Sequence, residues 1–189
     1  MNTIMRDKIE ALYGAGILRK SAMNIRGGAG AFEWAMTGKG YRTAVEIGTY
    51  RGVAAAEMSQ YCDRVITIDL LHGKLEQNGE QWDRYAFWSA LGVTNVEFFA
   101  VGGDIDKARL LRSLEFDFAF IDGAHDRTVA GDFKMVKKCG NVLFHDADDN
   151  RLRADKPHAS NHVYEFISRL PQAQIKTHDI FALWTRADG

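Results

Sequence analysis

The chain has few cysteines, almost no net charge and no long apolar run. Only two cysteines, Cys62 and Cys139, occur among its 189 residues, so we expect two separate thiols and neither a disulfide framework nor a metal pair. A formal net charge of -1 provides no field that would attract nucleic acid or an anionic membrane. No window is apolar enough to span a bilayer, and charged residues interrupt residues 1–20, unlike a signal peptide. These absences predict a cytoplasmic protein with no nucleic-acid partner and no membrane attachment.

The apolar residues that are present suffice for one core. They make up 46% of the 189 residues, which is enough for one well-buried core. A chain of this length is too short for two ordinary domains. We therefore expect a single domain over residues 1–189. Within it, residues 1–40 are predicted to form a helical cap before a core over residues 41–186.

Apolar periodicity and turn residues predict an alternation of strands and helices. Five strands are expected at residues 43–48, 64–70, 96–101, 116–121 and 141–144. The predicted helices cover residues 3–18, 32–36, 52–61, 80–91, 105–113, 127–138 and 161–170. Two last strands, at residues 173–177 and 180–185, are separated only by His178 and Asp179. That gap is too short for a helical crossover and predicts an antiparallel hairpin.

The most informative motif lies at the end of the first predicted strand. There the chain reads Val45-Glu46-Ile47-Gly48-Thr49-Tyr50-Arg51-Gly52, and the second strand ends on Asp69. Glycines at such a turn let backbone N–H groups approach a ligand closely, and an acid at the next strand end can accept hydrogen bonds from ribose hydroxyls. The joint pattern therefore indicates a nucleotide-like ligand at the carboxyl ends of the strands.

This acid-x-Gly-x-x-x-Gly spacing resembles that of class I S-adenosylmethionine (SAM)-dependent methyltransferases. It differs from the dinucleotide fingerprint, in which a glycine stands at the position of Tyr50. The resemblance covers about residues 41–186, and the terminal hairpin agrees with it. It implies an α/β, Rossmann-like fold with a mostly parallel seven-stranded sheet, a C-terminal antiparallel hairpin and helices on both faces.

By the same resemblance, a set of residues would hold the cofactor. Glu46 would orient the methionine ammonium directly or through water, and Asp69 would bind the ribose. Asp104 would accept a hydrogen bond from the adenine amino group and Ile105 would pack on the ring. The implied cofactor contacts in full are Glu46, Gly48, Tyr50, Gly52, Asp69, Leu70, Asp104, Ile105 and Asp122. Two alternatives stay open: Glu46 could pair with an arginine, and Asp104 could be a helix N-cap.

A second motif pair follows the fourth and fifth predicted strands, where Ile121-Asp122-Gly123-Ala124-His125 and His145-Asp146 occur. It resembles a branch of these methyltransferases that includes bacterial enzymes acting on sugar or other hydroxyl groups. The resemblance implies catalytic roles for His125, Asp122 and His145, and Mg²⁺ as a candidate cofactor on Asp122, Asp146 and Asp149.

The sugar enzymes carry an acid where this chain has Ala124, so we assign the general base to His125. The alternative for His125 is a helix cap or a hydrogen bond to a loop carbonyl.

The sequence thus predicts methyl transfer from SAM to a small-molecule acceptor, most simply at a hydroxyl oxygen and with Mg²⁺ assistance. Two alternatives remain: a metal-dependent hydrolase built on Asp122, His125 and Asp146, and a non-catalytic SAM-binding module. A short-chain dehydrogenase is disfavoured because no tyrosine is followed by lysine at the Tyr-x-x-x-Lys spacing. A homodimer that covers apolar residues of the cap is a candidate assembly.

Overall fold

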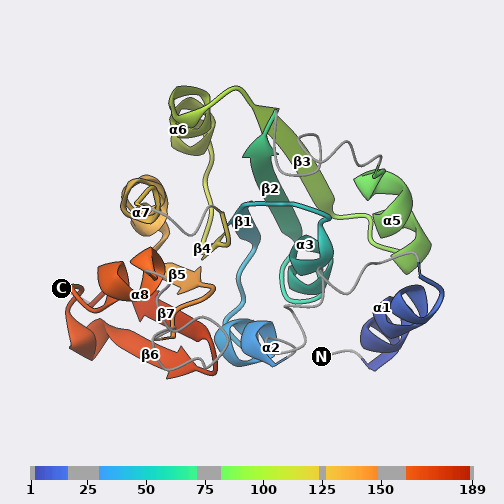
Figure 1. Cartoon of the computed structure of the whole chain (residues 1–189), viewed down its shortest axis with the longest axis horizontal. Helices are drawn as coiled ribbons and strands as arrows, with labels where there is room; N and C mark the ends of the chain where they lie inside the picture. The colour runs from blue at the N-terminus through green and yellow to red at the C-terminus, as the bar shows by residue number, and fades with distance from the viewer. Residues whose placement is uncertain (1–2, 17–29, 72–81, 124–126, 149–160, 188–189) are drawn as a thin grey trace.

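The computed structural model describes residues 3–16, 30–71, 82–123, 127–148 and 161–187, and these form one mixed sheet with flanking helices (Figure 1). The sheet has seven strands in the order β3-β2-β1-β4-β5-β7-β6. Their bounds are β1 Thr43–Ile47, β2 Arg64–Leu70, β3 Val96–Val101, β4 Phe118–Ile121, β5 Asn141–Phe144, β6 Ile175–His178 and β7 Phe181–Thr185.

Strand directions match the predicted architecture. β1 pairs in parallel with β2 and with β4, β2 with β3, and β4 with β5. β7 is antiparallel to both of its neighbours, β5 and β6, so the terminal hairpin is confirmed and one of its strands inserts into the sheet. The carboxyl ends of the four central strands therefore lie along one edge, where open α/β sheets bind ligands.

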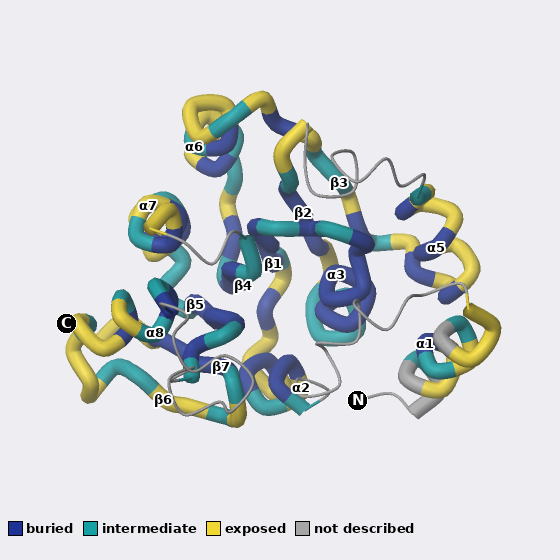
Figure 2. The backbone as a smooth tube through the Cα atoms, viewed as in Figure 1, coloured by how far each residue is buried: buried dark blue, intermediate teal, exposed yellow. Residues whose placement is uncertain are grey.

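Helices cover both faces of this sheet, as predicted. α1 (Thr3–Gly14), α2 (Ala31–Met36), α3 (Val53–Met58) and α5 (Arg84–Leu91) supply residues to one hydrophobic cluster. α6 (Asp104–Ser113), α7 (Val129–Val136) and α8 (His162–Ile167) supply residues to the cluster on the opposite face. Figure 2 shows the central strands buried between these layers. No helix among the described residues is long and apolar enough to cross a membrane.

Several element bounds differ from the prediction because local contacts override periodicity at the ends. The first helix ends at Gly14 and not at residue 18, and β4 begins at Phe118 because Asp117 turns back to accept hydrogen bonds from the N–H groups of Arg42 and Thr43. The helix predicted over residues 127–138 is α7 followed by a 3-10 turn, Lys137–Cys139. β6 begins after another such turn, Gln172–Gln174.

The two motif glycines are required by packing within the fold. Gly48 has a φ of 99°, and a Cβ there would lie 2.3 Å from the carbonyl oxygen of Asp122. Gly52 has a φ of 79°, and its Cβ would lie 2.6 Å from the indole ring of Trp88, whose Nε1 donates to the Gly52 carbonyl. Gly48 thus lets β4 approach β1, and Gly52 seats α5 against the turn before α3.

We predict that Gly52→Ala destabilises the protein more than Gly38→Ala. Both glycines have a positive φ, but no atom lies within 4 Å of the Cβ that would be added at Gly38. The backbone penalty alone is about 1–2 kcal/mol for Gly38→Ala. The clash with Trp88 adds about 1–3 kcal/mol for Gly52→Ala. Urea unfolding measures both values, and equal losses would contradict this packing role of Gly52.

Candidate functional site

The glycine-containing turn after β1 is fixed by side chains from neighbouring elements. The Gly48 N–H donates to the Ile68 carbonyl at 2.8 Å, which extends the β1–β2 ladder beyond the strand. Tyr50 adopts a positive φ of 44°, and its N–H donates to Asp69 Oδ2 at 2.8 Å. The Tyr50 carbonyl in turn accepts from Arg84 Nε at 2.6 Å. The turn is therefore held on both sides by hydrogen bonds.

Glu46 is a fully buried carboxylate at the end of β1. Its side chain has 0% exposure, the Thr67 hydroxyl donates to its Oε2, and Oε1 has no hydrogen-bond partner among the described residues. Burial raises the pKa of Glu46 well above its usual value, against the opposing effect of the Thr67 hydrogen bond. The charges of Asp122 and Asp69 raise this pKa further, and Arg84 lowers it. An ammonium group or a water molecule at Oε1 would supply the missing partner.

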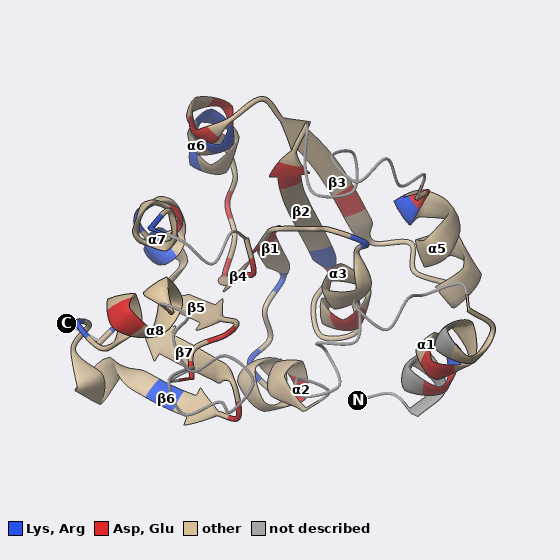
Figure 3. Ribbon diagram, viewed as in Figure 1, with Lys and Arg blue, Asp and Glu red and all other residues tan. Residues whose placement is uncertain are grey.

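Asp69, the last residue but one of β2, has both carboxylate oxygens oriented by backbone N–H groups. Oδ2 accepts from Tyr50 and Oδ1 accepts from Leu70, each at 2.8 Å. Each oxygen keeps a second lone pair for another donor, such as a ribose hydroxyl. Leu70, the next residue, is 46% exposed, and Ile105, in the first turn of α6, is 76% exposed. Figure 3 shows acidic segments gathered around these strand ends.

Asp104 begins α6 and has an exposed side chain that pairs with Lys107, whose second ion pair, with Asp132, is buried. The N-cap of α6 is Gly103, so the alternative reading of Asp104 as the N-cap is wrong. Lys107 Nζ lies 2.9 Å from Asp104 Oδ1 and 2.5 Å from Asp132 Oδ1 on α7. Burial lowers the pKa of Lys107, but the hydrogen bonds to Asp132 and Asp104 outweigh it, and the pKa is raised. The cluster joins α6 to α7.

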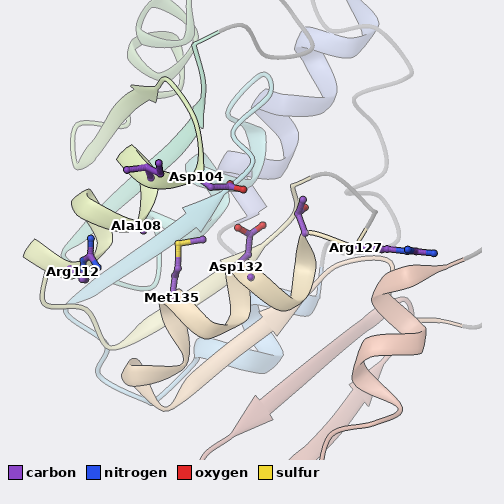
Figure 4. A pocket seen from close by; sticks show the side chains of 9 residues that line it. Asp104, Ala108, Arg112, Arg127, Asp132 and Met135 are labelled. Atoms are coloured by element: carbon purple, nitrogen blue, oxygen red, sulfur yellow. The ribbon is translucent and has the colours of Figure 1, made fainter.

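A groove of about 470 Å³ runs between α6 and α7 beside this cluster. Figure 4 shows Asp104 and Asp132 pointing into the same region of it. The residues that line it are Asp104, Ile105, Ala108, Arg112, Arg127, Thr128, Gly131, Asp132 and Met135. It therefore continues outward from two of the residues predicted to contact adenine.

Asp122, His145 and Asp146 converge after β4 and β5. His145 Nδ1 lies 2.8 Å from Asp122 Oδ1 and 3.8 Å from Asp146 Oδ1, so both acids stand close to one imidazole nitrogen. The His145 side chain is 5% exposed, against 25% for Asp122, and its ring lies near those of Phe120 and Phe181. The imidazole thus supports Asp122 from the protein interior, and Asp122 is the more accessible of the two.

The predicted Mg²⁺ ligands are only partly described. Among the described residues, no group of three or more His, Cys, Asp or Glu side chains could hold a metal ion. Asp122 and Asp146 supply two carboxylates, and a nitrogen of His145 stands close to both. Asp149, the third predicted ligand, and His125, the predicted base, lie outside the described residues.

Four site residues escaped the sequence analysis. Thr67 donates to Glu46 and is hydrogen-bonded to Thr49, and Arg84 donates to the Tyr50 carbonyl. Asn161 is buried, caps α8 through its Oδ1, and donates from Nδ2 to the carbonyls of Asp146 and Asp148. An Asn before an apolar helix could have been predicted as an N-cap from the sequence. Its hydrogen bonds to the segment after β5 could not, because they depend on the tertiary structure.

The fold is shared with solved methyltransferase structures. No protein-family model matches the chain, and no curated protein matches its sequence. The O-methyltransferase from Bacillus cereus, in complex with S-adenosylhomocysteine (SAH), matches with a TM-score of 0.64 and 14% identity over 98% of this chain and 92% of that one. The O-methyltransferase TomG from Streptomyces achromogenes, which is involved in tomaymycin synthesis and was solved with SAM, matches with a TM-score of 0.56 and 16% identity. That alignment covers 99% of this chain and 91% of TomG. The chain therefore has the class I methyltransferase fold.

We predict that the stability of the ligand-free Glu46→Gln variant increases relative to that of the ligand-free wild type as the pH rises. A raised carboxyl pKa in the folded state contributes stability that is complete below the unfolded pKa and is lost as the pH rises through the folded pKa. An amide does not titrate, so the stability of the variant minus that of the wild type should increase between pH 4 and pH 8. Thermal unfolding across that range measures this difference. A variant whose stability falls relative to the wild type as the pH rises would refute the raised pKa of Glu46.

A second variant tests the buried ion pair. Lys107→Met removes the cation from between Asp104 and Asp132, and breaking a buried pair costs about 3–5 kcal/mol. Arg109→Met is the matched control, because its pair with Asp106 is also on α6 but is exposed. That control should lose at most about 1 kcal/mol. Comparable losses in urea unfolding would show that the Lys107 cluster does not stabilise the fold.

Proposed function

We propose that this protein transfers a methyl group from SAM to a hydroxyl group of a small-molecule acceptor. The observation that carries the proposal is the buried Glu46 carboxylate, whose Oε1 has no partner among the described residues. It stands where β1, β2 and β4 end in a methyltransferase fold. A buried charge of this kind is costly without a cationic partner, and the ammonium of SAM is such a partner.

The other described residues support the same ligand. Asp69 would accept hydrogen bonds from the ribose hydroxyls, because each of its oxygens has capacity left beyond its backbone N–H donor. Leu70 and Ile105, which are exposed in the ligand-free protein, would bury apolar surface against the two faces of the adenine ring. Asp104, already placed by Lys107, would accept from the adenine amino group. The backbone of Gly48, Tyr50 and Gly52 would border the methionine half.

Catalysis in this proposal falls to the groups after β4 and β5. When bound, SAM supplies the electrophilic methyl carbon, whose bond to sulfur breaks as the acceptor oxygen bonds to it. Asp122 would lie beside the acceptor and orient its oxygen toward the methyl carbon, and His145 Nδ1 lies 2.8 Å from the Asp122 carboxylate. His125 would take the hydroxyl proton, since an imidazole titrates near neutral pH.

Magnesium assistance rests only on the convergence of Asp122 and Asp146. The described residues offer two carboxylates for an ion that prefers six oxygen ligands, and His145 Nδ1 already lies next to both. We therefore assign no step to a metal. Turnover that persists in EDTA agrees with this assignment, and turnover that requires added Mg²⁺ would make Asp122 and Asp146 ligands.

Calorimetric titration tests the cofactor class. We expect the wild-type protein to bind SAM and SAH and not NAD, because the turn after β1 has Tyr50 in place of the glycine that admits a pyrophosphate. Asp69→Ala should weaken SAH binding about tenfold or more, through loss of charge-assisted ribose hydrogen bonds. Binding of NAD without SAH would refute the proposal.

A kinetic test addresses the predicted base. We expect His125→Ala to lower kcat about 10²–10⁴-fold, the usual contribution of a general base, with SAH affinity unchanged. Methyl transfer from radiolabelled SAM, first to a panel of small hydroxylated acceptors with the wild type and then to the best acceptor with the variant, measures kcat. Unchanged turnover would remove His125 from the mechanism, and lost SAH affinity would place it in the cofactor site instead.

A further inference from the structure

A chain of hydroxyl groups lies beneath the Glu46 carboxylate. Glu46 of β1 and Thr67 of β2 are direct neighbours in the parallel register, and both have 0% exposure. The Thr67 hydroxyl donates to Glu46 Oε2, and its oxygen lies 2.6 Å from the Thr49 hydroxyl oxygen. Thr49 belongs to the turn between the two motif glycines and is itself buried. The three side chains thus form one connected row at the ligand-binding edge.

The proton count fixes the direction of this row. A threonine hydroxyl has one proton to donate and two lone pairs to accept with. Because Thr67 gives its one proton to Glu46 Oε2, it must accept the proton of Thr49. The row therefore runs from Thr49 to Thr67 to Glu46, and each donation strengthens the next.

This direction determines which part of Glu46 remains available. Oε2 is occupied by Thr67, whereas Oε1 has no partner among the described residues. With one oxygen held, the carboxylate cannot rotate freely, and Oε1 keeps a fixed position. A charge-assisted hydrogen bond also favours the ionised form that an ammonium needs.

We infer that Thr67, supported by Thr49, is a positioning residue that determines recognition of the amino-acid half of the ligand. The inference rests on the proposed function, because it takes the ammonium of SAM as the partner of Glu46. Thr67 acts through Glu46 and has no contact with the methyl group or the acceptor. Its removal should therefore change affinity for ligands that carry the amino-acid group and leave affinity for the adenosine half unaltered.

The test compares two ligands by calorimetry. SAH carries the ammonium, and 5′-methylthioadenosine keeps the adenosine and lacks the amino-acid group. Thr67→Val removes the hydroxyl at nearly constant shape, and we expect it to weaken SAH binding about 10- to 100-fold. Binding of 5′-methylthioadenosine should change less than about twofold. Thr67→Ser keeps a donor at the same position and should restore most of the SAH affinity.

Two further variants keep the inference falsifiable. Ile66→Val trims a buried residue of the same strand that packs on the opposite face, so it should alter neither affinity. Thr49→Val removes the first donor of the row and should weaken SAH selectively, by less than Thr67→Val; it replaces Thr67→Val as the test if that variant does not fold. If the threonine variants lose affinity for both ligands equally, or lose no affinity for SAH, the inference is overturned. The proposed function would still stand as long as the wild type binds SAM. Failure of the wild type to bind either ligand would overturn the proposed function as well.

Discussion

The site depends on one unfavourable arrangement, a carboxylate buried at the carboxyl end of the central strand. Glu46 lies at 0% exposure, with Asp69 and Asp122 close enough to raise its pKa further. Burying a charge without full compensation costs free energy that the rest of the fold must offset. The offset comes from apolar clusters on both faces of the sheet and from the Thr67 hydroxyl. Such a group is more easily explained as a ligand site than as a stabilising feature.

Parallel strand order brings the remaining groups to this carboxylate. β1 is flanked by β2 and β4, so Asp69 and Asp122 end next to Glu46 without any long loop. Gly48 permits this proximity, because a side chain there would meet the Asp122 backbone. His145, the residue after β5, lies next to Asp122, and Asn161 donates to the carbonyl of Asp146 in the segment beyond it. The geometry of the site therefore follows from the sheet, while helices and loops supply its rim.

Sequence patterns predicted the elements and the edge at which the acids gather, because strand burial and turn residues are local signals. The terminal hairpin was predictable from the short His178-Asp179 connection. The packing role of the glycines could not be predicted. Gly52 leaves room for the indole ring of Trp88, and the sequence does not show that these two residues are in contact. Thr67 and Lys107 were missed for the same reason, since their roles arise from partners on other elements. A 3-10 turn replaced the end of the helix predicted over residues 127–138, and another replaced the start of the strand predicted at residues 173–177.

A crystal structure of the protein soaked with SAH tests the account most directly. The account predicts the ligand amino group within hydrogen-bond distance of Glu46 Oε1, directly or through one water, and the ribose hydroxyls on Asp69. It also predicts the adenine between Leu70 and Ile105. A ligand bound elsewhere, or one whose amino group is turned away from a Glu46 that keeps Oε1 empty, would contradict the central role given to this carboxylate.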